Sequence, residues 1–200
     1  MELLGFDRRF TLLAQECHLT RATLLSGFDQ LLKANLYEEK DGLFYSAFFN
    51  ISIGMERLLK LAMVTHHMLI NDYRTPKISE LKNEYGHKIE ALYNKATGLI
   101  PHYSRPGVSK NAPELSQEDA SIIDFFSEYA IGSRYFNLNE VCEAKMKKSP
   151  INQWFELAQE IYRRHTPSGL RERANLNIFY QMDKAGIHNG FTRHKDEGAT

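Results

Sequence analysis

The stretch "LFYSAFFNISIGMERLLKLAMVTHHML", residues 43–69, decides the fold class. Its small and apolar residues recur at alternating steps of four and three: Phe44, Phe48, Ile51, Met55, Leu58, Ala62, Thr65 and Leu69. Such a stripe falls on one face of an α-helix, whereas a half-buried strand would alternate at every second residue. We therefore predict one helix of ~25–30 residues, ~40 Å long at 1.5 Å per residue. Asp41, just before the stripe, is its predicted N-cap.

Stripes of the same period lie on both sides of this helix. The first contains Phe6, Phe10, Leu13, Cys17, Thr20, Leu24 and Leu31. The second contains Ile78, Leu81, Tyr85, Ile89, Leu92, Ala96 and Leu99. Thr75-Pro76 suits an N-cap followed by proline at the first helical position of this last helix. Long helices with one apolar stripe and short connections pack as antiparallel neighbours in a bundle.

Two further helices are predicted after a loop. Residues 101–115 contain three prolines and a glycine and are predicted to be a loop. Ser116 is the predicted N-cap of a fourth helix, with acidic residues in its first turn. Ser149-Pro150 opens a fifth, which ends in a run of cations suited to a helix C-terminus.

The helical pattern weakens beyond Pro167. Residues 170–182 could form a helix or a strand, and the last residues lack apolar mass. The prediction for the whole chain is an all-α fold, an up-and-down bundle of four to five main helices with an additional C-terminal helical segment. This bundle forms a single domain over residues 1–180, followed by a loose tail at 181–200.

Charge and composition exclude several classes of protein. Lys plus Arg and Asp plus Glu both number 25, so there is no overall attraction to nucleic acid or to an anionic membrane. Cations cluster in the C-terminal third, in the segments 143–148, 162–165, 170–173 and 192–195. A basic patch that binds RNA and a solvated face of mixed charge both fit that pattern. Without a long apolar stretch or a cysteine framework, the chain is predicted to be cytoplasmic, with no membrane contact.

Motifs for cofactor or metal chemistry are missing from the sequence. The eight histidines form no HExxH pattern, and there is no glycine-rich phosphate loop and no GxSxG elbow. His66 and His67 are adjacent and point about 100° apart, which favours a polar role at the helix boundary over a ligand role. Cys17 lies on an apolar stripe and is predicted to be an inert buried cysteine. We therefore expect no cofactor and no metal.

A polar insertion interrupts the helix of residues 43–69. Glu56 and Lys60 stand at i and i+4, in the orientation that stabilises an exposed helical ion pair, with Arg57 between them. If Glu56 instead faces the bundle, it is a natural partner for an arginine arriving from the fourth helix. Arg134, in the segment "YAIGSRYFNLN" (129–139), is that arginine.

Three segments together resemble the HEPN superfamily: "AFFNISIGMERLLKLAMV" (47–64), "YGHKIEALY" (85–93) and "YAIGSRYFNL" (129–138). The matching positions are Glu56, Arg57, Lys60, His87, Ile89, Leu92, Arg134 and Tyr135. The resemblance covers about residues 40–140. It implies a helical bundle that dimerises, in a prokaryotic toxin–antitoxin, abortive-infection or other anti-phage system. It also implies kinship with metal-independent endoribonucleases that carry an Arg-x4-6-His motif at the dimer interface.

The chain departs from that motif at the histidine. In such ribonucleases the histidine serves as acid and base, while the arginine stabilises charge on the phosphate. After Arg134 the next histidine is His165, and Leu138, Asn139, Glu140 and Val141 stand where the motif's histidine would be. Asn137 can donate a hydrogen bond but cannot exchange a proton near neutral pH.

The favoured interpretation is therefore a non-catalytic HEPN-like domain. It would form a homodimer and bind RNA, a nucleotide or a cognate partner protein, with these ligand- or anion-binding residues: Arg134, Tyr135, Glu56, Arg57 and Lys60. One alternative is a metal-independent endoribonuclease with a rearranged site of Arg134, Asn137 and His87. A second alternative is a scaffold for protein–protein interaction.

Overall fold

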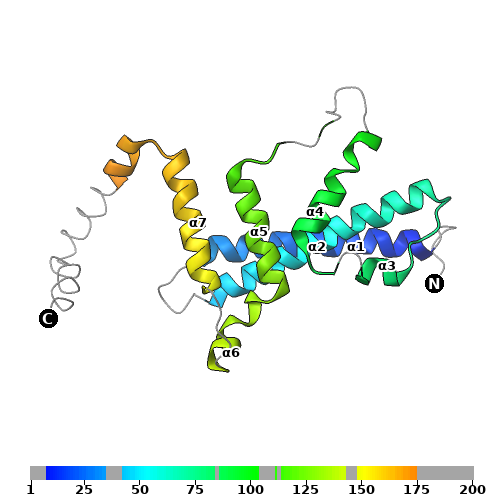
Figure 1. The fold of residues 1–200 in the computed structure, drawn as a ribbon, viewed down its shortest axis with the longest axis horizontal. Helices are drawn as coiled ribbons and strands as arrows, with labels where there is room; N and C mark the ends of the chain where they lie inside the picture. Colours follow the sequence, from blue (N-terminus) through cyan, green and yellow to red (C-terminus); the bar gives the residue numbers. More distant parts are fainter. Residues whose placement is uncertain are drawn as a thin grey trace. The chain divides into compact units, whose positions relative to one another are not determined.

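The computed structural model describes residues 8–34, 42–83, 86–103, 111, 114–142 and 148–174. The chain divides into two compact units, residues 1–157 and 158–200. The predicted N-cap Asp41 and the predicted tail at 181–200 lie outside the described residues, as does the proposed domain end at residue 180. The all-α prediction is confirmed, because the described residues form helices and turns without any strand (Figure 1).

Two long antiparallel helices form the base of the first unit: α1 (Arg8–Lys33) and α2 (Gly42–Ile70). They approach closely where each presents a glycine to the other. A Cβ on Gly27 of α1 would lie 2.7 Å from Ile51 Cγ1, and one on Gly54 of α2 would lie 2.6 Å from Leu24 Cδ2. Because any larger side chain would push the helices apart, these two glycines determine how tightly α1 and α2 pack.

The prediction of one continuous third helix is wrong. The structure has a short α3 (Ile78–Asn83), then α4 (Ile89–Thr97) and the 3-10 turn η1 (Ile100–Tyr103). Gly86 between α3 and α4 has a φ of 46°, a left-handed conformation that ends helical geometry and that glycine adopts at little cost. Ile89 and Leu92, both in α4, are fully buried, whereas Ile78 in α3 is 72% exposed. Ile89 and Leu92 of the predicted stripe therefore face the core, and Ile78 does not.

The fourth and fifth helices begin where the sequence predicts. In α5 (Gln117–Ile131) the Ser116 hydroxyl accepts from the Asp119 backbone N–H, and the Asp119 carboxylate accepts from the Ser116 backbone N–H. α7 (Pro150–His165) begins at the predicted proline, and the Asn152 backbone N–H donates to the Ser149 hydroxyl. Between them lie the 3-10 turn η2 (Ser133–Tyr135) and the short α6 (Phe136–Val141). No helix among the described residues is long and apolar enough to cross a bilayer.

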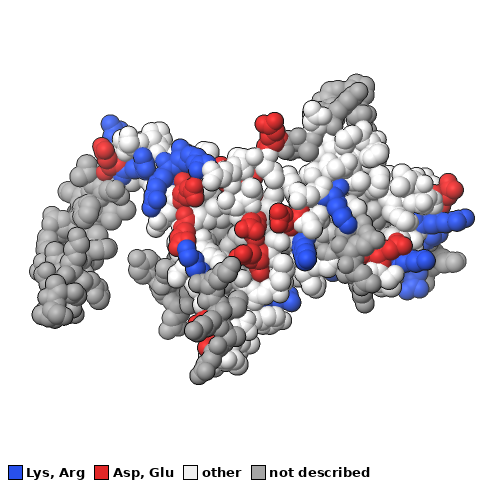
Figure 2. Space-filling view, viewed as in Figure 1, with Lys and Arg blue, Asp and Glu red and all other residues white. Residues whose placement is uncertain are grey.

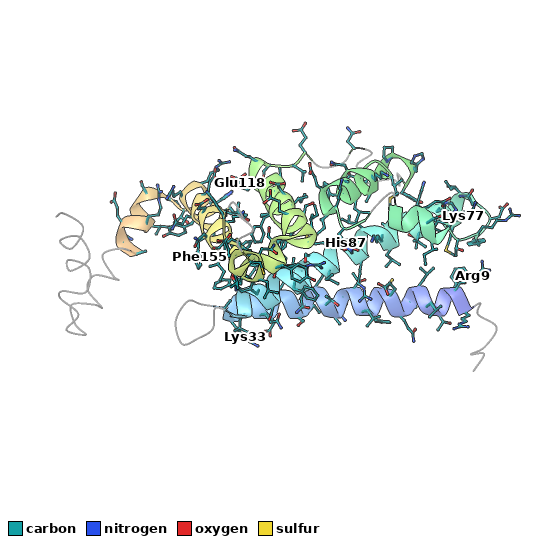
Figure 3. The ribbon with its side chains drawn as sticks, turned by 60° about the horizontal axis from the view of Figure 1, so that its bottom comes forward. Arg9, Lys33, Lys77, His87, Glu118 and Phe155 are labelled. Atoms are coloured by element: carbon teal, nitrogen blue, oxygen red, sulfur yellow. The ribbon has the colours of Figure 1, made fainter. Side chains whose placement is uncertain are left out.

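The core of the first unit is an aromatic cluster. Phe48 of α2 is fully buried and lies at its centre. Its ring centroid is 4.9 to 6.4 Å from those of four residues on α5 and α7: Phe125, Phe126, Tyr129 and Trp154. Edge-to-face contacts of this kind add stability beyond the burial of apolar area. α2 thus lies between α1 on one side and α4 with α5 on the other (Figure 3).

Cys17 is exposed, so its prediction as a buried cysteine is wrong. The main neighbour of α1 is α2, and one helix covers only a narrow face of another. That face centres on Thr20 and Gly27, the two buried residues of α1, and Cys17 lies at its margin. Phe10, on the same predicted stripe, is likewise 44% exposed.

Candidate functional site

Arg134 lies in the turn that ends α5. The helix stops at Gly132, and the 3-10 turn η2 then carries Arg134 and Tyr135. The Arg134 guanidinium carbon is 4.9 Å from the centroid of the Tyr135 ring, a cation–π distance. Its Nε is buried without a hydrogen-bond partner. No ion pair joins Arg134 to any carboxylate in the described part of the chain, so its positive charge is not neutralised there.

Two tyrosines and an asparagine complete the surroundings of Arg134. The Tyr129 hydroxyl donates to the Tyr45 carbonyl at 3.0 Å, and the Tyr45 hydroxyl donates to Asn137 Oδ1 at 3.4 Å. Burial raises the pKa of Tyr129 to about 12; Tyr45 adds to the rise, and the nearby positive charge of Arg134 opposes it. We call Tyr45, Tyr129, Arg134, Tyr135 and Asn137 the Arg134 cluster. Tyr135 is 51% exposed, so the cluster reaches the surface.

Glu56 has two nitrogen partners, Lys60 and His87, and Arg134 is neither of them. Lys60 Nζ donates to Glu56 Oε1 at 2.7 Å, and His87 Nδ1 lies 2.9 Å from Glu56 Oε2. Burial alone would raise the pKa of the Glu56 carboxyl, but the hydrogen bonds and charges of Lys60 and His87 outweigh it and lower the pKa. Glu56 therefore faces the bundle, as one alternative held, but with His87 in the place expected for Arg134. We call Glu56, Lys60 and His87 the Glu56 cluster.

The two clusters lie apart within one protomer. Tyr45, in the Arg134 cluster, and Glu56 both belong to α2, eleven positions apart. At 1.5 Å of rise per residue this separates them by ~16 Å along the helix. His87 lies against the middle of α2, beside Glu56 (Figure 3). The structure thus links Asn137 to the surroundings of Arg134 through Tyr45 and Tyr129, but does not bring His87 to them.

Arg57 connects two helices instead of joining either cluster. Its Nε lies 2.9 Å from Glu16 Oε1 on α1, and both side chains are partly exposed. The pair links α1 to α2 beyond their glycine crossing. Of the five predicted ligand-binding residues, Arg134 and Tyr135 therefore form one group, Glu56 and Lys60 a second, and Arg57 a structural contact.

The histidines at the end of α2 also make a structural contact. His66 Nδ1 lies 2.7 Å from the Tyr103 hydroxyl in η1, and its ring is 5.5 Å from that of His102. This agrees with the predicted polar role at the helix boundary. Within the described residues, no group of three or more His, Cys, Asp or Glu side chains could hold a metal ion.

The sequence did not identify Tyr45 and Tyr129 as parts of the site. Each lies on a helix with many aromatic residues, where a tyrosine near Arg134 has the same local sequence pattern as a core tyrosine. Of the residues beside Arg134 and Tyr135 in the Arg134 cluster, the sequence points only to Asn137, because it is a polar residue three positions after Arg134. Comparison of the chain with protein-family models, with curated proteins and with solved structures finds no match.

Proposed function

We propose that this chain is a non-catalytic, HEPN-like helical domain that binds RNA through the Arg134 cluster. The observation that carries the proposal is the Arg134 guanidinium, which has a buried Nε without a partner and forms no ion pair with a carboxylate among the described residues. An arginine in this state is suited to a phosphate group, whose charge and geometry match the guanidinium fork. The resemblance to the HEPN superfamily adds a setting, a homodimeric component of a prokaryotic defence or toxin–antitoxin system.

The neighbours of Arg134 fit a single-stranded nucleic acid better than a free anion. Tyr135 is half exposed beside the guanidinium and offers a ring on which a base can stack. Asn137 carries an amide that can donate to a base or to a ribose hydroxyl. Phosphate contact by arginine and stacking on an aromatic ring together characterise proteins that bind single strands with little sequence preference.

The test is fluorescence anisotropy with a labelled single-stranded RNA at low salt. We expect Arg134→Ala to weaken binding by about tenfold or more, since a charged hydrogen bond and a counterion contact are lost. Arg134→Lys should recover only part of the affinity, because lysine keeps the charge and loses the fork. Tyr135→Ala should also weaken binding, by removal of the stacking surface.

Arg74→Ala is the matched control. Arg74 is an exposed arginine in the turn after α2, distant in sequence from the Arg134 cluster. If Arg74→Ala costs as much affinity as Arg134→Ala, the binding is diffuse electrostatic attraction and the proposed site is wrong. Absence of saturable RNA binding by the unaltered protein would contradict the proposal itself.

The Glu56 cluster supports a second candidate function, a metal-independent endoribonuclease. The buried Glu56 carboxylate holds His87 Nδ1, while the His87 side chain stays 58% exposed. In neutral imidazole, a hydrogen bond from Nδ1–H leaves Nε2 as the proton acceptor. His87 is thus oriented as a general base, with Glu56 as its positioning residue.

The corresponding reaction needs no metal. His87 Nε2 would take the proton of a ribose 2′-hydroxyl, and the 2′-oxygen would form a bond to the adjacent phosphorus. The bond from phosphorus to the 5′-oxygen would break, and that oxygen would take a proton from water. The products are a 2′,3′-cyclic phosphate end and a 5′-hydroxyl end.

Cleavage of RNA in the presence of EDTA tests this second candidate. We expect activity to fall by about 10²–10⁴ in His87→Ala if His87 is the base. Glu56→Gln should lower the rate less and alter its pH profile, because His87 would remain but lose its orienting carboxylate. Absence of cleavage by the unaltered protein would leave the non-catalytic proposal as the sole candidate.

A further inference from the structure

The second unit contains a shallow surface cavity, largely open to solvent, that is built by two helical segments. Its volume is about 370 Å³, and it is lined by Gln159, Tyr162, Arg163, Ser168, Arg171 and Glu172. All six lie within residues 158–200, so the cavity belongs to this unit alone. Arginine side chains gather over the C-terminal part of α7 and the helical turn that follows it (Figure 2): Arg163, Arg164, Arg171 and Arg173.

The spacing of the lining residues explains why they converge. Gln159, Tyr162 and Arg163 stand at i, i+3 and i+4 on the last turns of α7, and therefore share one face. After Pro167, residues 168–174 are helical again and contribute their own i, i+3 and i+4 set, beginning at Ser168. The backbone N–H groups of Leu170 and Arg171 both donate to the Pro167 carbonyl, which starts this turn. The cavity lies where the two sets meet.

Both arginines of the cavity lack a carboxylate partner among the residues that the structure describes. Arg163 Nη2 donates to Gln159 Oε1 at 3.1 Å, a neutral contact that orients the guanidinium. Arg171 has a buried Nε with no hydrogen-bond partner. Although Glu172 lines the same cavity, no ion pair joins either arginine to it, or to another carboxylate, in the described part of the chain. Two uncompensated guanidinium groups at one cavity attract an anion.

We propose that this cavity binds a ribose phosphate, either as a free nucleotide or as the phosphorylated end of an RNA strand. Arg163 and Arg171 would hold the phosphate, with the Ser168 hydroxyl as a further donor. Glu172 would accept from the ribose hydroxyls, since a carboxylate repels a phosphate and accepts from hydroxyl groups. Tyr162 is 47% exposed and presents its ring to a base.

The size of the cavity is consistent with this ligand. About 370 Å³ lies at the lower end of the range for small-molecule sites and is enough for one nucleotide, while the open side leaves room for a strand to continue into solvent. The proposal does not depend on the Arg134 cluster, because the cavity residues all lie in the second unit and the Arg134 cluster lies in the first. An RNA could use both sites, and each can fail without the other.

The experiment is isothermal titration of the full chain with adenosine monophosphate, adenosine and inorganic phosphate. We expect saturable binding of adenosine monophosphate with a Kd below about 1 mM, weaker binding of phosphate, and none of adenosine. Competition by an RNA carrying a 5′-phosphate, but not by the same RNA with a 5′-hydroxyl, would assign the site to an RNA end. Absence of such competition would assign it to a free nucleotide.

Variants distinguish this site from general basicity. Arg171→Ala and Arg163→Ala should each weaken the binding of adenosine monophosphate by about tenfold, and Arg171→Lys should restore only part of it. Arg173→Ala, in the same helical turn but outside the lining, is the matched control and should have little effect. Glu172→Gln should weaken the binding of adenosine monophosphate, because the carboxylate no longer accepts from the ribose hydroxyls. The same change should strengthen the binding of inorganic phosphate, because the repulsion between the Glu172 carboxylate and the phosphate is lost.

Several outcomes would overturn the proposal. The first is the absence of saturable nucleotide binding, and the second is that adenosine binds as tightly as adenosine monophosphate. The third is that Arg173→Ala and Arg171→Ala lose the same amount of affinity for adenosine monophosphate. Circular dichroism of each variant separates lost binding from lost structure. Arg74→Ala, an exposed arginine of the first unit outside both proposed sites, should leave binding of adenosine monophosphate unchanged, which separates the cavity from diffuse basicity.

Discussion

At the scale of single residues, Glu56 is the charged side chain of α2 that the structure shows to be buried. Its carboxylate is buried between an ammonium and an imidazole that come from different parts of the chain. His87 precedes α4, so this contact ties the start of α4 to the middle of α2. A buried carboxylate is stable only while such partners satisfy it.

Replacing Glu56 with glutamine tests that contact. The amide keeps the shape but loses the negative charge that faces Lys60 and one of the two oxygens that bind Lys60 and His87, so we expect a loss of ~1–2 kcal/mol in the free energy of unfolding. The measurement is urea denaturation at neutral pH. Asp29→Asn is the control, because Asp29 forms an i,i+4 pair with Lys33 in which both side chains are mostly exposed. That change should cost less than ~0.5 kcal/mol; an equal loss in both variants would contradict the argument.

The pH dependence of the same comparison follows from the lowered pKa of Glu56. A carboxyl whose pKa is lower in the folded state than its ordinary value of 4.5 adds stability that is fully present above that value. This stability is lost as the pH falls through the lower, folded-state pKa. The difference in unfolding free energy between the unaltered protein and Glu56→Gln should thus stay constant above about pH 4.5 and shrink below it. A difference that grows on acidification would show that Glu56 is not held as the ion.

At the scale of elements, the close approach of α1 and α2 depends on Gly27 and Gly54. A methyl group at Gly54 would lie 2.6 Å from two atoms of Leu24, which real contacts essentially never show. We expect Gly54→Ala to lower the free energy of unfolding by ~1–3 kcal/mol through overpacking, despite the higher helix propensity of alanine. Gly42→Ala, at the first residue of α2 and with open space around it, should be neutral or slightly stabilising. Equal midpoints of urea denaturation for the two variants would contradict the claim that the close approach of α1 and α2 requires Gly54.

The elements show which features a sequence pattern can predict. The periodic stripes and the capping residues Ser116 and Ser149 predicted α1, α2, α5 and α7, because helix periodicity and capping are local properties. They did not predict the break at Gly86, since one glycine inside a helical pattern is usually tolerated and its φ of 46° is decided by tertiary packing. Cys17 was wrongly predicted to be buried. An apolar stripe shows which way the apolar face of a helix points, but it does not show how much of that face the neighbouring helix covers.

The candidate site was predictable only in part for the same reason. The segment "YAIGSRYFNLN" identifies Arg134 and Tyr135 as neighbours along the chain, and the structure confirms that they are in contact. The partner of Glu56 could not be read from the sequence, because Arg134 and His87 are both far from it along the chain. Only the packing of α4 against α2 selects His87.

At the scale of the whole molecule, α1 presents a surface that the first unit itself does not cover. Leu25, Phe28 and Leu32 follow one another at i, i+3 and i+7, and each is at least half exposed. Leu12 and Leu19, on another side of the helix, are each 50% exposed. Large apolar patches on a protein surface mark interaction sites. This feature supports the homodimer that we propose for the chain, with α1 as the helix to test.

A charge placed in this surface should therefore separate the protomers. We expect Phe28→Glu to convert the proposed homodimer into a monomer at tens of micromolar, because a carboxylate buried in an apolar interface loses its hydration without gaining a partner. Ser26→Glu adds the same charge to an exposed position of the same helix and should leave the dimer intact. Sedimentation velocity measures both, and circular dichroism confirms that each variant stays helical. A monomer already in the unaltered protein would remove the homodimer from the proposal, while dissociation by both variants would show that α1 responds to charge in general and not at Phe28.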